Sequence, residues 1–219
     1  MFLYQSDLVK TGNDTYASII LFESSIIRLD SNTEITLKEI ITDADRTSVT
    51  IQQDAGRTWN TVLKVSGIDD YEVQTPTTVA SVRGTSFDVY IKDDNITDVG
   101  VVRGVVTVSK IFNNEIVDSI ELKMNQVTSI YANKFDQILK IVEFLIDDWV
   151  LKNQLKDQDF QYDVKEDLYE RIDPYIPEIK ERWGVTDEEL DVLVEGYING
   201  NFDLPPETPN WIKDLMELS

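Results

Sequence analysis

The sequence predicts a mainly β N-terminal domain, a β-roll or a short solenoid-like sandwich, followed by an all-α C-terminal segment. Three observations predict this segregated α+β architecture. Up to about residue 130, β-branched residues alternate with polar ones in short segments, the periodicity of half-buried strands. Turn residues separate these segments about every 10 residues. After residue 130 the apolar residues recur at helical spacing. We therefore expect two domains, residues 1–130 and residues 131–219.

Turn signals rich in Gly, Asn and Asp delimit the expected strands, because these residues tolerate the backbone conformations of tight turns. The signals are TGND, DSNT, DAGR, SGIDD, KDDN and FNNE. The strands expected between them are TYASIILF (15–22), SIIRL (25–29), TEITLKEI (33–40), TSVTIQQ (47–53), TVLKV (61–65), YEVQT (71–75), TSFDVYI (85–91), DVGVVRG (98–104), VVTVSKIF (105–112), SIELKM (119–124) and VTSIYA (127–132).

The C-terminal helices are expected at five places. The first covers Phe135 to Trp149, and its apolar residues should supply most of the interface with the β domain. The second covers residues 163–172, and prolines start a third, PYIPEIKERW, which Gly184 should end. Residues 186–189, TDEE, form a capping box at the start of a fourth, and a last helix follows Pro209.

Composition excludes several classes of function. The chain has 219 residues, no Cys, no His and a formal net charge of −21. Thiolate and imidazole metal sites, disulfides and His-based catalysis are therefore impossible. A field of this sign also repels nucleic acids. Net charge is −8 over residues 1–130 and −13 over residues 131–219. The more acidic tail is either a solvated face or a surface for a basic partner.

One stretch, Tyr71 to Val108, carries a motif. It reads as a strand, a turn, the sequence VRGT, a second strand, an acidic hairpin and a strand that ends in glycine. Upstream, DLVKTG (7–12) and LFESSIIRL (21–29) add two further steps of the same pattern, with Glu23-Ser24-Ser25 in the place of a turn. The residues that define the motif are Thr75, Pro76, Val82, Arg83, Gly84, Thr85, Phe87 and Gly104.

These residues closely resemble the signature of the FecR-domain family, over about residues 4–110. The family consists of envelope-located regulators that receive signals through protein contacts. The resemblance therefore implies an extracytoplasmic, periplasmic or cell-surface, module with a protein partner. It also implies that the full-length protein is anchored in a membrane through a segment missing from this chain. The helical tail departs from the receptor-coupled regulators, which have a small mixed α/β domain there, and this favours a signalling or structural envelope module over control of a sigma factor.

The motif residues themselves indicate structural roles. Pro76 suits a strand end, because it lacks an N–H, and Gly84 indicates a bulge or a backbone conformation closed to other residues. Thr75 and Thr85 suit turn-stabilising hydroxyls. Arg83 is expected as a buried or half-buried clamp, so that Arg83→Ala lowers thermal stability, with a ligand-contacting arginine as the alternative.

Other constellations predict little chemistry. Asp93, Asp94, Asn95 and Asp98 offer oxygen ligands but lack the glycine and the distal glutamate of a calcium loop, so we interpret them as a solvated hairpin tip. The adjacent pair Asp147-Asp148 is interpreted as helix surface rather than as an acid–base pair. We therefore expect no catalytic residue, no metal site and no cofactor.

The alternative function is a carbohydrate- or cell-wall-binding β module with a helical adaptor. Aromatic side chains motivate it, and their clustering on one face would support it, whereas burial of all four tryptophans would contradict it. The residues concerned are Trp59, Trp149, Trp183, Trp211, Tyr71, Tyr90 and Tyr131.

Overall fold

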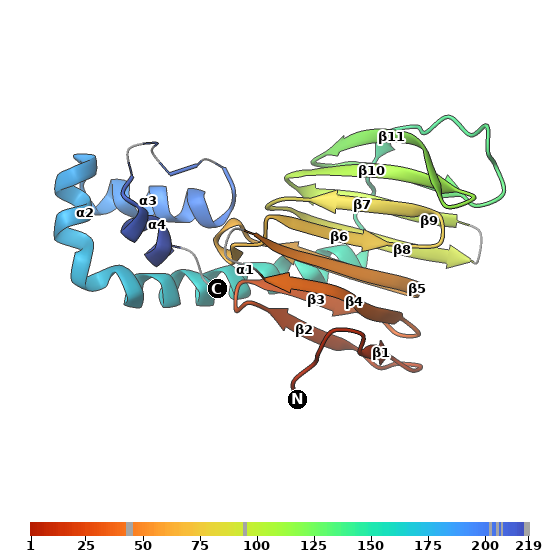
Figure 1. The fold of residues 1–219 in the computed structure, drawn as a ribbon, viewed down its shortest axis with the longest axis horizontal. Coiled ribbons are helices and arrows are strands. Elements are labelled where there is room, and N and C mark those ends of the chain that lie inside the picture. The colour runs from red at the N-terminus through yellow and green to blue at the C-terminus, as the bar shows by residue number, and fades with distance from the viewer. Residues whose placement is uncertain (43–45, 94–95, 202, 205, 207, 217–219) are drawn as a thin grey trace.

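The structure is a computed structural model that describes residues 1–42, 46–93, 96–201, 203–204, 206 and 208–216. Within these residues, a curled β-sheet makes up the first part of the chain and helices make up the last part (Figure 1). The fold class that the sequence predicts is therefore confirmed.

The sheet has two halves that share one long strand, β5 (Thr47–Val62). All strand pairs are antiparallel except β5–β6. Half A runs in the order β1 (Leu8–Lys10), β4 (Glu34–Thr42), β5, β6 (Asp70–Gln74), β7 (Thr78–Val82), β10 (Val105–Phe112) and β11 (Glu115–Lys123). Half B runs in the order β2 (Ala17–Leu21), β3 (Ser25–Leu29), β5, β8 (Ser86–Asp93), β9 (Ile96–Arg103), β12 (Gln126–Tyr131) and β13 (Val142–Glu143).

The expected turn at DAGR, residues 54–57, is wrong, because β5 continues through it. The register against β4 shifts opposite this segment, which marks a bulge. Gly56 has φ 80°, and a Cβ there would lie 2.5 Å from the Cα of Thr33. The glycine therefore bends the strand from half A into half B where the sequence suggests a break between two strands.

The β core lies between the two halves. Strand alternation places apolar side chains inward on both, as the period-2 pattern predicts. Fully buried examples are Ile35, Ile51, Val73 and Val108 from half A and Leu29, Phe87, Val99 and Ile130 from half B.

The helices form a second core. They are α1 (Asp148–Ile172), the short 3₁₀ turn η2 (Asp173–Tyr175), α2 (Ile176–Trp183), α3 (Asp187–Ile198) and α4 (Asn210–Met216). Two side chains of the β part, Leu63 and Val65 at the 3₁₀ turn η1 (Lys64–Ser66), belong to this second core. The helices therefore pack on one end of the sheet as well as on each other.

Three helix boundaries follow the sequence. Gly184 ends α2 with φ 67° in the left-handed region. Thr186 and Glu189 form the predicted capping box of α3. The last helix begins directly after Pro209, at Asn210.

The expected helix over Phe135 to Trp149 is wrong, because α1 begins only at Asp148. Val142 pairs with Val127, and the N–H of Phe144 donates to the Asn125 carbonyl at 2.9 Å. The ring of Phe144 lies directly over Gly100, whose missing side chain makes the room. These long-range contacts hold the segment extended although its own spacing favours a helix.

A buried lysine also fixes this extended segment. Lys110 on β10 is 1% exposed, and its ammonium donates to the carbonyls of Lys134, Phe135 (3.1 Å) and Gln137 (3.5 Å). A side chain from half A thus binds three backbone carbonyls at the beginning of this segment, where the Gln137 N–H also donates to the Lys134 carbonyl in a turn.

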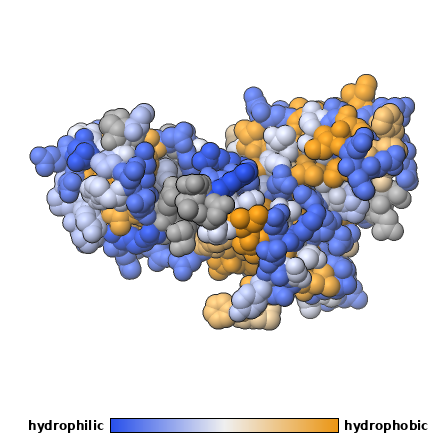
Figure 2. All heavy atoms as spheres, in the orientation of Figure 1, coloured by the Kyte–Doolittle hydropathy of each residue, from blue (hydrophilic) through white to orange (hydrophobic). Residues whose placement is uncertain are grey.

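The helical lobe has a predominantly hydrophilic surface on the face shown in Figure 2, in keeping with the −13 charge of residues 131–219. Among the residues that the structure describes, no helix is long and apolar enough to cross a membrane.

Candidate functional site

The signature begins with a tight turn between β6 and β7. The N–H of Thr75 donates to the Thr78 carbonyl at 2.8 Å, and the N–H of Thr78 donates back to the Thr75 hydroxyl at 3.0 Å. Pro76 is exposed in this turn, where its fixed φ suits the second position. The hydroxyls of Thr77 and of Thr97 on β9 lie 2.7 Å apart, so the turn also contacts half B.

A second turn follows between β7 and β8. Gly84 has φ 69°, in the left-handed region, and this confirms the expected backbone conformation that is closed to most other residues. On either side of the turn, Val82 and Phe87 are buried in the β core. The hydroxyl of Thr85 donates to the Val105 carbonyl at 3.0 Å, which joins this turn to the start of β10.

Arg83 lies on the outside of this turn. Its side chain is exposed, so the expectation of a buried or half-buried clamp is wrong. The reason is local: Val82 takes the inward position, and Arg83, next along the chain, points away from the core. The ligand-contacting alternative for Arg83 therefore gains weight.

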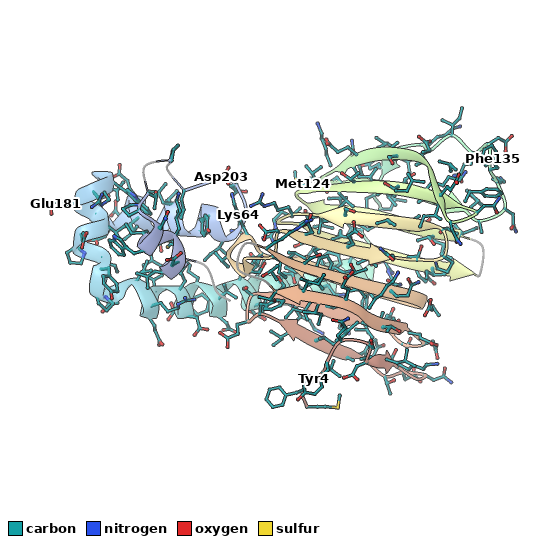
Figure 3. All side chains as sticks on the ribbon, viewed as in Figure 1. Tyr4, Lys64, Met124, Phe135, Glu181 and Asp203 are labelled. Carbon is teal, nitrogen blue, oxygen red and sulfur yellow. The ribbon has the colours of Figure 1, made fainter. Side chains whose placement is uncertain are left out.

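The helical lobe meets the signature at this turn, in a region that we name the signature corner. It consists of Lys64, Gly84, Arg103 and Gly104 from the β part and Asn199, Gly200 and Asp203 from the segment after α3. Arg103 donates to the Asn199 side-chain carbonyl at 2.5 Å. Lys64 pairs with Asp203 at the junction between strands and helices (Figure 3).

The charges of the corner influence each other. The hydrogen bond from Lys64, with a contribution from Arg83, holds the pKa of Asp203 below its usual range. Burial lowers the pKa of Arg103. In the described part of the chain, Nε and Nη2 of Arg103 are buried without a hydrogen-bond partner. At the corner, two cationic side chains of the β part thus bind the polar Asn199 and the acidic Asp203 that follow α3.

Helix α1 is fixed to half B by a buried carboxylate. Asp157 pairs with Arg28 of β3, and its second oxygen accepts from the Trp59 indole N–H at 3.0 Å and from the Thr61 hydroxyl at 2.6 Å. All four residues are at most 5% exposed. Further along, α1 contributes Val164 and Leu168 to the helical core. One rigid helix therefore spans the sheet and the helical lobe.

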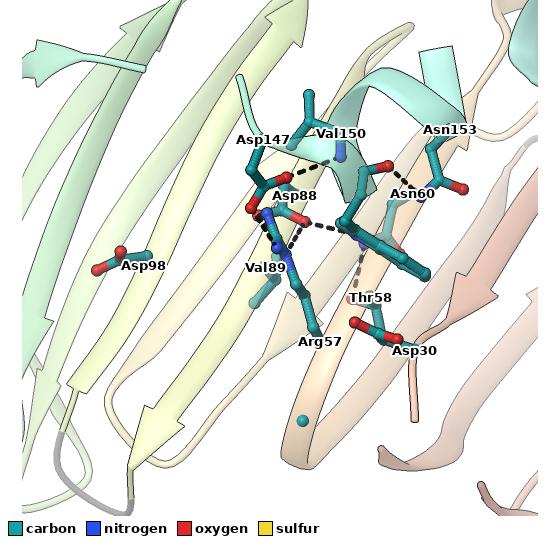
Figure 4. A network of polar contacts seen from close by, with 12 residues as sticks. Asp30, Arg57, Thr58, Asn60, Asp88, Val89, Asp98, Asp147, Val150 and Asn153 are labelled. Atoms are coloured by element: carbon teal, nitrogen blue, oxygen red, sulfur yellow. Dashed lines mark hydrogen bonds and ion pairs between the residues drawn. The ribbon is translucent and has the colours of Figure 1, made fainter. Parts of the chain in front are cut away.

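A second polar network holds the beginning of α1 (Figure 4). The Arg57 guanidinium donates to both oxygens of Asp88 at 2.9–3.1 Å and to Asp147 at 2.7 Å. Asp147 also caps α1 by accepting from the Val150 N–H at 2.9 Å. The indole N–H of Trp149 donates to Asp88 at 3.2 Å. The first turn of α1 is thereby tied to β5 and β8.

Burial and charge oppose each other in this network. Burial raises the pKa of Asp88 to about 6, against the attraction of Arg57 and the hydrogen bond from Trp149. Burial also lowers the pKa of Arg57, but the two carboxylates outweigh it and raise the value above the ordinary range. Partial burial raises the pKa of Asp147, yet the hydrogen bonds from Arg57 and Val150 lower it overall.

We expect the stability of the protein to depend on pH through Asp88. Its pKa is about 6 in the folded state against an ordinary 3.8, so folding is favoured when the group is protonated. This contribution is complete below pH 3.8 and is lost as the pH rises through about 6. The free energy of unfolding of the wild type, minus that of Asp88→Asn, should therefore fall between pH 4.5 and 7. Denaturant titrations at several pH values measure the difference; a carboxyl pKa below 4 by NMR would contradict it.

The acidic residues that were weighed for metal binding and catalysis lie in separate parts of the structure. Among the described residues, no three Asp or Glu side chains come together as a cluster. Of the residues weighed for calcium, Asp94 and Asn95 lie outside the described residues, and Asp98 pairs with Lys92. Asp147, weighed with Asp148 for acid–base chemistry, is the helix cap described above.

Local sequence patterns do not identify several residues of these networks. Asp157 occupies the apolar stripe of α1 between Val150 and Val164, and this position is the signal that indicates a buried partner. Its partner Arg28 lies 129 residues away in the chain, so no local pattern identifies it. The buried Lys110 gives no comparable signal in its strand.

The chain is similar to known proteins over its β part. Residues 7–107 match the family model described as FecR protein. Two crystal structures of a candidate anti-sigma factor from Parabacteroides distasonis ATCC 8503 are similar to the chain, with TM-scores of 0.50 and 0.49 and identities of 16% and 17%. Each comparison covers 63% of this chain and 59% of the other, so the chain spans well under two thirds of those proteins.

At such identity the first of these likenesses concerns the fold alone. No curated protein matches the chain. The family assignment rests on the matched segment, which contains all eight signature residues from Thr75 to Gly104. Residues 7–107 of this chain are a domain of the FecR family.

Proposed function

We propose that this chain is a non-enzymatic regulatory module that works outside the cytoplasm, in the periplasm or at the cell surface, through contact with a protein partner. The FecR domain supports regulation and signalling as the general role. The Parabacteroides protein of similar fold is described as a candidate anti-sigma factor, and this description agrees with that role. Membrane anchoring of the full-length protein belongs to the same proposal.

The observation that carries the proposal is the signature corner. The family signature folds into two tight turns, and the second of them contacts the helical lobe directly. The two expected units, residues 1–130 and 131–219, are in this view coupled by β13, by α1 and by the corner. A partner that contacts either unit can then change the position or stability of the other.

Within the signature we assign two kinds of role. Seven signature residues shape the turns: Thr75, Pro76, Val82, Gly84, Thr85, Phe87 and Gly104. Arg83 does not shape them, because its side chain is exposed and has no hydrogen bond among the described residues. An exposed arginine beside a structured corner suits recognition of a carboxylate or a carbonyl on a partner.

Replacement of Arg83 tests this assignment. We expect Arg83→Ala to change the free energy of unfolding by no more than about 0.5 kcal/mol, the scale of exposed surface positions. In the source organism, a photo-crosslinker at a neighbouring exposed position should capture a protein partner with the wild type and lose it with Arg83→Ala. Arg182→Ala, which removes an exposed arginine from α2, is the control and should retain the adduct. A variant that melts several degrees lower with an unchanged adduct would assign Arg83 to the fold instead.

The carbohydrate-binding alternative has weaker support. Trp59 is fully buried, and the other tryptophans are half-buried, so the condition that would exclude this function is not met. Tyr90 and Trp149 both lie against the Arg57 guanidinium, but the four tryptophans are spread over the sheet and the helical lobe. Trp149 stacks on Tyr16 beside the sheet, whereas Trp211 packs on Tyr175 in the helical lobe.

A further inference from the structure

One edge of half B has no partner strand. Strand β2 pairs with β3 on one side, and in the described part of the chain no strand pairs with its other side. Its five residues, ASIIL, include no charged residue and no proline. Sheet edges in soluble proteins are usually protected by charges, prolines or bulges. The edge strand β11 of half A follows that rule, with three acidic residues and a lysine.

A hollow of about 470 Å³ lies beside this edge. Tyr16, at the entry to β2, forms one wall, and Trp149, Leu151 and Leu155 of α1 form the other. The lining is completed by Asp30, Asp148 and Lys152. The hollow is therefore bounded by Tyr16, the residue before the unpaired strand β2, and by the flank of helix α1.

The walls of the hollow are unusually apolar for exposed surface. Tyr16, Leu151 and Leu155 are 63%, 51% and 56% exposed. Ile20 on β2 is 60% exposed and lies on the same face of the strand as Tyr16, because side chains alternate along a strand. The opposite flank of α1 packs on the sheet, where Asp157 contacts Arg28. Exposed apolar surface of this kind marks an interaction site.

We propose that an extended segment of a partner protein, with apolar and basic side chains on one and the same face, adds to half B as a strand beside β2. Its backbone pairs with the free edge, and its apolar side chains enter the hollow between Tyr16 and Leu155. Its basic side chains, on the same face as the apolar ones, meet the carboxylates of Asp30 and Asp148, which line the same hollow. This inference rests on the proposed function and names the chemistry of the partner.

Charge selects this occupant over a second copy of the chain. The hollow carries two carboxylates and one ammonium group, and the whole chain carries −21. A basic segment is attracted by this field, whereas another copy of the same acidic chain is repelled.

The contacts of the Trp149 ring favour a peptide over a sugar as the ligand of the hollow. Its ring already stacks on Tyr16, with centroids 6.4 Å apart, and lies 6.0 Å from the Arg57 guanidinium. Its indole N–H donates to Asp88. A sugar platform needs an aromatic face that is open to the ligand, and this ring is engaged by protein groups.

The test uses the intact isotope-labelled chain and a synthetic nine-residue peptide. Valine and lysine occupy its odd-numbered positions, which share one face of a strand, and threonine occupies its even-numbered positions. We expect the peptide to shift the NMR signals of residues 17–21 and to slow hydrogen exchange of their edge amides. Ile20→Lys should weaken binding by about tenfold or more, the scale of one buried isoleucine side chain. Ile116→Lys is the matched control, because Ile116 is 64% exposed on the edge strand β11. Both variants should melt like the wild type.

Four results would overturn the inference. The first is equal binding of a peptide with glutamate in place of lysine, and the second is weaker binding with Ile116→Lys but not with Ile20→Lys. The third is a chitin oligosaccharide that shifts the Trp149 signals when the peptide does not. The fourth is a dimer of the free chain that Ile20→Lys dissociates. None of these results concerns Arg83 or the signature corner. If the peptide does not bind, the proposed function is still decided by the Arg83 crosslinking experiment. Conversely, that crosslinking experiment can fail while the peptide still binds.

Discussion

Replacement of Asp157 by alanine should lower the free energy of unfolding by about 3–5 kcal/mol, the cost of removing one partner of a buried ion pair. The carboxylate is 5% exposed, and Arg28, which is 4% exposed, would keep its charge in the sheet without a counterion. The Trp59 indole N–H and the Thr61 hydroxyl would lose their acceptor as well. Urea or guanidinium unfolding, followed by Trp fluorescence, measures the change.

Two further variants separate the buried network from general effects on α1. Asp159→Ala removes an exposed carboxylate two residues away and should change stability by no more than about 0.5 kcal/mol. The double variant Arg28→Met with Asp157→Leu should recover much of the loss, because replacing both partners of a buried pair by apolar residues leaves no isolated charge. A loss below about 1 kcal/mol for Asp157→Ala would show that water reaches Arg28 and that the network does not hold α1 to the sheet.

The β part of the fold follows closely from the sequence where one side of a strand is buried. Alternation along β6, β7 and β10 places Val73, Ala80 and Val108 in the core, and no long-range information is needed to find these strands. The signature turns follow too, because Gly84 indicates a positive φ by its chemistry alone.

The same reasoning is wrong where distant contacts outweigh local preference. Residues 135–149 carry a helical spacing, but Lys110 occupies their carbonyls and Phe144 packs on Gly100, and both partners lie in strands well before this segment. At residue 56 a glycine that usually marks a turn permits a bend within β5, because the backbone of Thr33 passes close by. Local periodicity contains no information on either partner.

The candidate site was predicted only in part for a related reason. The sequence identifies Arg83 as a residue with many donors, but burial depends on which side of the turn it takes, and Val82 takes the inner side. The groups that couple sheet and helices, Asp157 and Arg103, lie 129 and 96 residues from their partners. Only the polar character of Asp157 within an apolar stripe indicates that such a partner exists.

Replacement of Gly104 by alanine should lower the free energy of unfolding by about 2–5 kcal/mol, from about 1–2 kcal/mol for a left-handed non-glycine residue and about 1–3 kcal/mol for overpacking. Gly104 has φ 80°, and a Cβ there would lie 2.8 Å from the Gly84 carbonyl oxygen and 2.8 Å from the Thr85 hydroxyl oxygen. The carbonyl belongs to the backbone of the signature turn, so rotation of a side chain cannot relieve that contact.

Gly67→Ala is the control that divides this loss into its two parts. Gly67 has φ 63°, but a Cβ there would meet nothing within 4 Å, so only the backbone cost applies. Equal losses for the two variants would show that the signature turn yields to the extra methyl group and does not depend on the close approach of its two glycines. A larger loss for Gly104→Ala, together with Arg83→Ala melting like the wild type, would divide the signature as we propose. Its glycines would then fix the corner, and its arginine would be left free to contact a partner.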